Sequence, residues 1–375
     1  MAVTLADVAA RAGVSAATVS RVLSGNYPVA GATRSRVLRA VEELEYVVNG
    51  PASALAAATS DLVGVLVNDI ADPFFGIMAS AVQSEMEPEK AGRKLAVVCN
   101  TGGSPERELT YLTLLQRQRA AAVVLTGSAV EDEEHTSALA ARLRRLAEAG
   151  TRVVLCGRPP LPEADGGADE GNGKREADGG KGEEDGKRAA APVTVAFDNR
   201  GGARRLTEHL LALGHRRIGY VAGPVERTTT RHRLEGHRAA LADHDPALLA
   251  DAGRLTVHGA YDRSSGYDGA LELLRREPDL TAVLAANDTV ALGVCAALRD
   301  RGLRIPEDVS VAGFDDLPFS ADAAPALTTV RIPLHEAGAR AGRLALGREP
   351  APPGGVATVR TELMARASTA PPRAD

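Results

Sequence analysis

Residues 4–24 read TLADVAARAGVSAATVSRVLS, a pattern of two short helices joined by a tight turn. Thr4 and Asp7 have the spacing of a capping box, which predicts a first helix that runs through Ala12. Gly13-Val14 predicts the turn, and Ser15 is a suitable cap for the helix that follows.

The second helix has two different faces, and a third helix is predicted from about residue 32 to residue 46. The apolar face of the second helix carries Val19, Val22 and Leu23. Its opposite face carries Ala16, Ala17, Ser20, Arg21 and Ser24. In the third helix we expect Val37, Leu38, Val41 and Leu44 to point inward. Together the three helices predict a helix-turn-helix domain.

Such a domain suits double-stranded DNA, because small residues on the second helix let its backbone approach the major groove closely. Arg21 is long enough to reach a base edge or a phosphate, and Thr18 and Ser20 can donate to phosphate oxygens. Residues 1–41 carry a net charge of +4 in a chain whose total is −5, an asymmetry that also favours a polyanion partner. The alternative is a small helical bundle used for protein contacts.

Length and composition limit the class of protein. A chain of 375 residues, 44% hydrophobic and 25% charged, is typical of a globular protein with two or three domains. The sequence has no apolar run long enough for a membrane span and no N-terminal pattern of a secretion signal. Cys99, Cys156 and Cys295 lie in apolar runs, so we expect buried thiols in a reducing cytoplasm.

From Asp61 onward, apolar runs of strand length alternate with helical stretches, once over residues 62–156 and again over residues 218–312. This alternation predicts an α/β body of two lobes, each a doubly wound parallel sheet, with a ligand cleft beyond the carboxyl ends of the strands. Residues 161–190 are rich in glycine and charge and contain no Val, Ile, Phe or Tyr, so we expect a disordered insertion at the first crossover between the lobes.

The sequence resembles the lactose-repressor (LacI/GalR) family of bacterial transcription regulators, in blocks that occur in family order. These are TLADVA (4–9), AGVS (12–15), TVSRVL (18–23), DIADPFF (69–75), DNRGGA (198–203), EHL (208–210), LGHRRI (213–218), AAND (285–288), PEDVSVAGFDD (306–316) and LTTVR (327–331). The resemblance implies a DNA-binding domain over residues 1–47, a hinge over 48–60 and a periplasmic-binding-protein-like body over 61–375.

For DNA binding, the resemblance and the helix pattern together single out Thr4, Ser15, Ala16, Ala17, Thr18, Ser20, Arg21, Thr33 and Leu55. In the family the hinge folds as a helix on DNA and inserts a leucine into the minor groove, here Leu55. Ser53 departs from the family, which often has a basic or amide side chain there. A plain flexible linker remains the alternative.

For effector binding, the resemblance carries over Phe74, Phe75, Arg227, Thr229, Arg233, Tyr261, Asn287 and Asp315. Aromatic faces with amide, carboxylate and guanidinium groups suit a polyhydroxylated molecule, and we expect a sugar or sugar derivative. Three alternatives stay open: one phenylalanine lies in the lobe core, Asp315 caps a helix, or Arg233 forms a surface ion pair. Ile332 replaces a glutamine found in many relatives, and Arg227, Arg231 and Arg233 together also suit a phosphate or carboxylate.

The sequence contains no GxSxG, GxxxxGK[ST] or HExxH motif and no GxGxxG after a predicted strand, so nothing in it predicts an enzyme. His209 and His215 are poorly spaced for a shared metal, and for His232, His237 and His244 we expect solvated surface positions. We expect no cofactor and no metal. A solute-binding protein for transport shares the two-lobed body but needs an export signal. The expectation is therefore a cytoplasmic, nucleoid-associated homodimer, a repressor that binds operator DNA under allosteric control by a small carbohydrate effector, with no membrane partner.

Overall fold

A computed structural model describes residues 3–24, 28–46, 60–87, 94–162 and 191–373 of the chain. The chain divides into two compact units, Met1–Ser60 and Asp61–Asp375. The expected hinge over residues 48–60, with Leu55, falls almost entirely outside the described residues, as does most of the expected insertion. Among the described helices, none combines the length and the apolar character that crossing a membrane requires.

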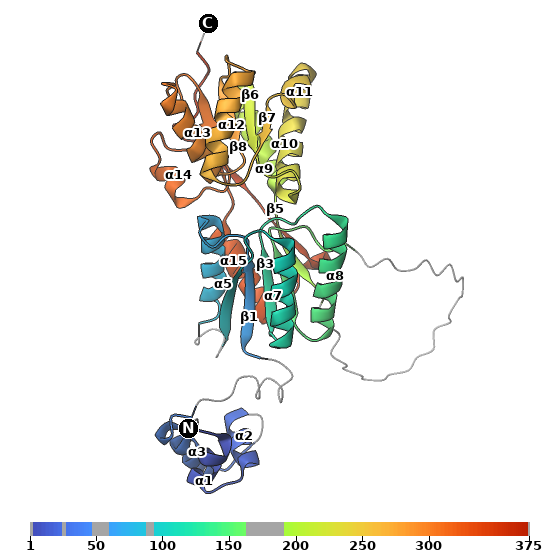
Figure 1. The fold of residues 1–375 in the computed structure, drawn as a ribbon, viewed down its shortest axis with the longest axis vertical. Helices are drawn as coiled ribbons and strands as arrows, with labels where there is room; N and C mark the ends of the chain where they lie inside the picture. Colours follow the sequence, from blue (N-terminus) through green and yellow to red (C-terminus); the bar gives the residue numbers. More distant parts are fainter. Residues whose placement is uncertain (1–2, 25–27, 47–59, 88–93, 163–190, 374–375) are drawn as a thin grey trace, which may run out of the picture. The chain divides into compact units, whose positions relative to one another are not determined.

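The first unit contains three helices, α1 (Leu5–Ala12), α2 (Ala16–Ser24) and α3 (Gly31–Glu43) (Figure 1). Val8, Val19 and Val37, one from each helix, are fully buried in its core. The prediction that Leu38 points inward is wrong, since it is 45% exposed while Ala40 is buried. The buried side of α3 runs through Val37, Ala40, Val41 and Leu44, a spacing of three and four residues, and Leu38 falls outside it.

Lobe 1 of the second unit is built on a six-stranded, all-parallel sheet in the order β11-β5-β4-β3-β1-β2. Its strands are β1 (Leu62–Val67), β2 (Leu95–Asn100), β3 (Ala122–Thr126), β4 (Arg152–Cys156), β5 (Val193–Phe197) and β11 (Val356–Val359). Its helices are α5 (Pro73–Ser84), α7 (Pro105–Arg117), α8 (Glu133–Glu148), α15 (Leu334–Leu346) and the short η1 (Pro353–Gly355).

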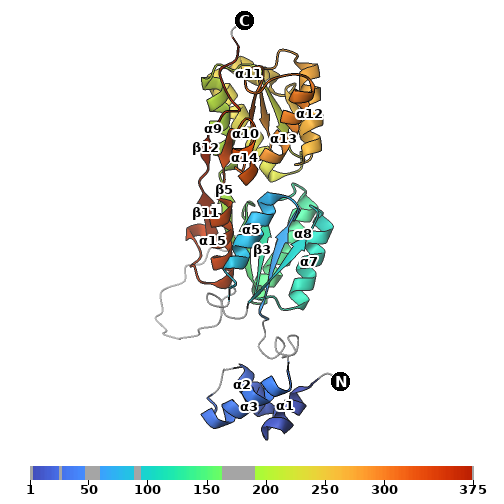
Figure 2. The same ribbon diagram turned by 90° about the vertical axis from the view of Figure 1, so that its left-hand side faces the viewer.

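Alternation along the strands places apolar side chains on both faces of this sheet, which is why both faces are covered. Val65 and Val124 pack with α5 and α15, whereas Leu66 and Leu125 pack with α7 and α8 (Figure 2). Cys99 is only half-buried because β2 lies at the edge of the sheet, so the expectation of three buried thiols holds only for Cys156 and Cys295.

Lobe 2 is built on a four-stranded parallel sheet in the order β7-β6-β8-β9, with a separate antiparallel pair, β10 and β12. Its strands are β6 (Ile218–Ala222), β7 (Thr256–His258), β8 (Ala282–Ala285), β9 (Ser310–Ala312), β10 (Thr329–Arg331) and β12 (Glu362–Met364). Its helices are α9 (Asn199–Ala212), α10 (Thr228–His244), α11 (Pro246–Ala252), α12 (Arg263–Arg276), α13 (Asp288–Asp300) and α14 (Pro318–Asp322). The α9–α11 helices cover one face of the sheet, and α12 and α13 cover the other (Figure 1).

The expected α/β architecture of two doubly wound parallel sheets is confirmed. The chain passes between the lobes three times, at residues 197–199, 331–334 and 359–362. The expected position of the insertion is wrong, because residues 157–192 join β4 to β5, which are neighbours in the sheet of lobe 1. The first passage between the lobes comes only after β5.

Candidate functional site

The helix-turn-helix of the first unit is set by local hydrogen bonds. The Oγ1 of Thr4 accepts from the backbone N–H of Asp7 at 3.3 Å, and Oδ2 of Asp7 accepts from the backbone N–H of Thr4 at 2.8 Å. Gly13 ends α1 with φ +64°, a conformation that glycine adopts without strain. Ser15 Oγ then accepts from the backbone N–H of Thr18 at 3.2 Å and fixes the start of α2.

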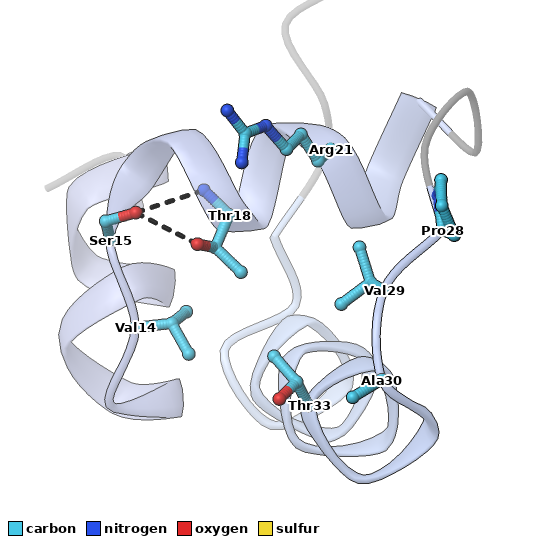
Figure 3. Close-up of a pocket in the computed structure, with 8 residues that line it drawn as sticks. All are labelled: Val14, Ser15, Thr18, Arg21, Pro28, Val29, Ala30 and Thr33. Atoms are coloured by element: carbon cyan, nitrogen blue, oxygen red, sulfur yellow. Dashed lines mark hydrogen bonds between the residues drawn. The ribbon is translucent and has the colours of Figure 1, made fainter.

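This geometry points one face of α2 outward. Ser15, Ala16, Ala17, Ser20 and Arg21 are exposed, while Val19 and Val22 hold the helix on the core. A surface hollow of about 740 Å³ runs between α2 and the start of α3. Figure 3 shows the side chains around it, which are Val14, Ser15, Thr18, Arg21, Pro28, Val29, Ala30 and Thr33.

Seven of the nine predicted DNA-binding residues either lie on this exposed face of α2 or line the hollow, with two exceptions. Thr4 lies at the start of α1, where its side chain caps the helix, and it does not line the hollow. Leu55 is outside the described residues.

The described part of the first unit is less positive than residues 1–41 alone. α3 extends through Glu43, so residues 3–46 hold five arginines and four acidic residues, for a net charge of +1 rather than +4. Arg11 is paired with Glu43. The net charge is therefore a weak indication of a polyanion partner, and the exposed face of α2 is the stronger one.

All eight residues predicted to bind an effector line one cavity of about 700 Å³ between the lobes. Phe74 and Phe75 come from α5 in lobe 1, and the other six come from lobe 2. Three of the six come soon after a strand, and the other three lie in α10 or at its N-cap, which follows β6. Ligand sites in parallel sheets lie at the carboxyl ends of the strands, and this rule accounts for their convergence.

Arg233 is the centre of the polar wall in lobe 2. Its Nε donates to Asn199 Oδ1 at 2.9 Å, its Nη2 donates to Asp315 Oδ1 at 2.8 Å, and its Nη1 donates to the carbonyl of Ala286. The guanidinium lies 3.7 Å from the centroid of the Phe314 ring. Arg233 and Asp315 are both buried, so the alternatives of a surface ion pair and of a helix cap are excluded for this pair.

Burial raises the pKa of Asp315 to about 7, against the opposing effect of the Arg233 guanidinium. Asn287 is also buried, and its Oδ1 accepts from the backbone N–H of Val290 at 2.8 Å to cap α13. Tyr261 is held by a 2.6 Å hydrogen bond between its hydroxyl and that of Thr230. These contacts fix the side chains before any ligand arrives.

Arg227 and its neighbours also join the two lobes along one edge of the cavity. Arg227 Nη2 donates to the carbonyl of Gly103 at 2.7 Å, and the backbones of Val130 and Arg227 form an antiparallel bridge. Arg231 Nε donates to Glu131 Oε1 at 2.6 Å and Nη1 to Glu235 Oε1 at 2.9 Å.

The wall in lobe 1 is aromatic. Phe75 is buried and Phe74 half-buried, and their rings meet edge to face at 5.0 Å, so the interpretation that one of them belongs to the core holds for Phe75. Phe197 and Phe319 line the cavity as well. Since Phe314 lies under Arg233, all five phenylalanines of the chain lie at or beside this cavity.

Several lining residues were not predicted. They include Asn68, Asp69, Asp72, Ser128, Phe197, Asn199, Asp262, Arg263, Thr289 and Phe319. Most follow a strand directly, so the same carboxyl-end rule could have found them. Ile332, by contrast, is buried in the core and does not line the cavity.

Histidines do not form a metal site in the described part of the chain, where no group of three or more potential ligands gathers. The expectation that His237 is solvated is wrong. It is fully buried in α10, where Nδ1 lies 3.0 Å from Thr207 Oγ1, and burial lowers its pKa to about 3. His215 is buried too.

Comparisons with known proteins find matches in both units of the chain. Residues 4–49 match bacterial regulatory proteins of the lacI family, and residues 207–369 match the periplasmic binding protein-like domain. The HTH-type transcriptional regulator GalS of Salmonella typhimurium is 35% identical over 344 residues, which cover 92% of this chain and 89% of GalS.

Two solved structures extend the comparison. A complex of the transcriptional regulator CelR with cellobiose is 31% identical with a TM-score of 0.62, and the match covers 98% of this chain and 99% of CelR. A lac repressor dimer bound to operator and the anti-inducer ONPF is 26% identical with a TM-score of 0.72, over 99% of this chain and 100% of that one. The chain therefore belongs to the lacI family of bacterial transcriptional regulators.

Proposed function

We propose that this regulator is a repressor that binds operator DNA through α2 and is controlled by a small molecule in the cavity between the lobes. The observation that supports it most is that one chain holds both parts, an outward helix face of small and hydroxyl side chains and a cavity lined by preset polar groups. The proposed division is a DNA-binding domain over residues 1–47, a hinge over 48–60 and an effector-binding body over 61–375.

On DNA, α2 enters the major groove with Ala16 and Ala17 nearest the bases, since their small side chains permit a close approach. Arg21 reads a base edge, and the hydroxyls of Thr18, Ser20 and Thr33 donate to phosphates. The Ser15 hydroxyl orients that of Thr18 at 3.0 Å, and Thr4, whose hydroxyl donates to Asp7 Oδ2 at 2.7 Å, contributes by holding the start of α1. Leu55 would wedge into the minor groove.

In the cavity, the favoured effector is a neutral polyhydroxylated molecule, of which a carbohydrate is the natural class. Arg233 is paired with Asp315, and Arg231 with Glu131 and Glu235, so two of the three arginines that suited a phosphate already have carboxyl partners. The aromatic wall of lobe 1 offers a surface for the C–H face of a sugar, and the polar wall of lobe 2 offers partners for its hydroxyls. The CelR complex with cellobiose supports this class.

The proposal includes a homodimer, supported by the lac repressor dimer bound to operator. Two symmetric DNA-binding domains require a two-fold symmetric operator. A regulator of this kind works in the cytoplasm, at the nucleoid.

DNA binding is tested by selection from a random duplex library with the full chain. We expect the wild type to enrich a two-fold symmetric sequence and Arg21→Ala to lose that enrichment. Arg39→Ala removes the same charge from an exposed position of α3 and should retain it. Absence of enrichment by the wild type contradicts the proposal, and equal loss in both variants contradicts the role of Arg21.

Effector binding is tested by thermal denaturation with a panel of sugars and sugar phosphates. A molecule at 100 times its dissociation constant stabilises the protein by about 2.7 kcal/mol. We expect a neutral sugar to raise the melting temperature and Asp315→Ala to abolish the rise. A rise with sugar phosphates alone would overturn the assignment to a neutral ligand.

A further inference from the structure

Two adjacent aspartates form an unusual turn after β9. Asp315 has φ +105° and Asp316 has φ +56°, a region that residues with side chains rarely adopt. The turn sends the two carboxylates to different places. Asp315 faces Arg233 at the cavity, whereas Asp316 faces the segments that join the lobes.

Asp315 is tied by its backbone to the second passage between the lobes. Its N–H donates to the carbonyl of Val330 at 2.8 Å, and its carbonyl accepts from the N–H of Ile332 at 3.3 Å. A displacement of the Asp315 main chain by a molecule in the cavity is therefore transmitted directly to residues 330–332.

Asp316 reinforces this link with two charge-assisted hydrogen bonds. Its Oδ2 accepts from Arg331 Nε at 2.7 Å, and its Oδ1 accepts from Arg366 Nη2 at 2.6 Å. Its side chain is 8% exposed, and that of Arg366 is 16% exposed, so solvent screens their interaction only weakly.

The two arginines lie next to different passages: Arg331 begins the second passage, and Arg366 lies four residues after the third. Arg331 is the last residue of β10 and opens the passage to α15, which packs in lobe 1. Arg366 lies just after β12, which receives the chain from β11 of lobe 1 through residues 359–362. One carboxylate thus joins the turn at the cavity to the second passage and to the segment that follows the third.

We propose that Asp316 is a positioning residue that sets the orientation of the two lobes and passes the state of the cavity to it. Asp315 contacts what enters the cavity, and Asp316 holds the second passage and the segment after the third to the same turn. The role of Asp316 in regulation rests on the proposed function, because regulation requires that an effector occupies the cavity. The role of Asp316 in fixing the orientation of the lobes does not depend on an effector.

The test measures the distance between the lobes in the full chain without DNA or sugar. Nitroxide labels are attached at Glu148→Cys in α8 and Arg238→Cys in α10, both exposed positions, in a Cys99→Ser background. Double electron–electron resonance on labelled protein diluted with unlabelled protein then gives the distribution of distances within one chain.

The matched control is Asp308→Asn. The Asp308 carboxylate also bridges two arginines, accepting from Arg304 Nε at 2.8 Å and pairing with Arg373 Nη1 at 2.7 Å, but neither lies on a passage between the lobes. We expect Asp316→Asn to broaden the distribution about twofold and Asp308→Asn to leave it at the wild-type width.

Thermal denaturation of each variant separates positioning from loss of stability. If Asp316→Asn does not fold, Arg331→Gln removes one of its two ion pairs, leaves the pair with Arg366, and is expected to give a smaller broadening in the same direction. A wild-type distribution in Asp316→Asn, or equal broadening in Asp308→Asn, would overturn the proposal. Because no DNA or sugar is present, such a result leaves the tests of DNA and effector binding intact.

Discussion

Replacing Arg233 with methionine isolates the buried ion pair at the cavity. Methionine keeps an unbranched apolar stem of similar reach and can still contact the Phe314 ring, so little packing is lost. What disappears is the charged group that donates to Asn199, Ala286 and Asp315. Breaking a buried pair by removing one partner leaves an uncompensated charge, and the free energy of unfolding should fall by about 3–5 kcal/mol.

The loss should depend on pH in a defined direction. Burial already raises the pKa of Asp315 to about 7 with Arg233 present, and without it the folded chain holds that proton more tightly. A folded-state pKa above the unfolded one means that stability is lost as pH rises. The wild type and Arg233→Met should both lose stability as the pH rises toward 7, and above pH 7 the unfolding free energy of Arg233→Met alone should continue to fall, by about 1.4 kcal/mol per pH unit.

Urea denaturation of the wild type and Arg233→Met at pH 5 and pH 8, followed by circular dichroism, measures both effects. The double variant Arg233→Met/Asp315→Asn removes the orphaned charge with a residue that tolerates the left-handed backbone, and it should recover about 2 kcal/mol at pH 8. A loss below about 1 kcal/mol in Arg233→Met, or no recovery in the double variant, would refute the reasoning.

Three further predictions concern the fold around the site. Gly127→Ala places a Cβ 2.7 Å from Phe75 at φ +82°, whereas Gly150→Ala at φ +89° meets nothing within 4 Å. Both variants strain the backbone, so in urea denaturation Gly127→Ala should be less stable than Gly150→Ala by about 1 kcal/mol or more. Burial lowers the pKa of His237 to about 3, so between about pH 3 and 6.5 the unfolded chain binds a proton that the folded one does not, and His237 makes the unfolding free energy rise with pH by up to about 1.4 kcal/mol per unit. That contribution should vanish in His237→Gln, and an unchanged slope in denaturation at several pH values would contradict it. In the first unit, Leu38→Gln should change stability by less than about 0.5 kcal/mol and Val37→Ala should cost about 1–3 kcal/mol, as followed by thermal denaturation; equal losses would contradict the observed orientation of α3.

Local patterns predicted most of the molecule correctly. The capping box at Thr4, the turn at Gly13 and the cap at Ser15 are each a spacing of a few residues, and each occurs as the sequence indicates. The two sheets were predictable because their strands are continuous apolar runs between helices. The eight cavity residues came from resemblance to a family, and the structure brings all eight to one cavity.

The failures share a physical cause, which is contact between segments far apart in the sequence. Nothing near β5 indicates that it lies beside β4, so the insertion was placed between lobes instead of within lobe 1. His237 lies in a helix rich in polar residues, but α10 packs so closely on α9 that Gly236 has no room for a Cβ beside Arg200. The His237 ring then forms a hydrogen bond with the Thr207 hydroxyl on α9, a partner that helical periodicity cannot reveal.

The position of β11 determines when lobe 1 can complete its sheet during synthesis. This strand completes the sheet of lobe 1 beside β5, yet it lies after all of lobe 2 apart from β12. While a ribosome is making lobe 2, β5 has an open edge and the face that α15 will cover is bare. At about 5–20 residues per second this interval lasts on the order of ten seconds. Lobe 1, the first lobe to be started, is therefore among the last parts of the body to be completed.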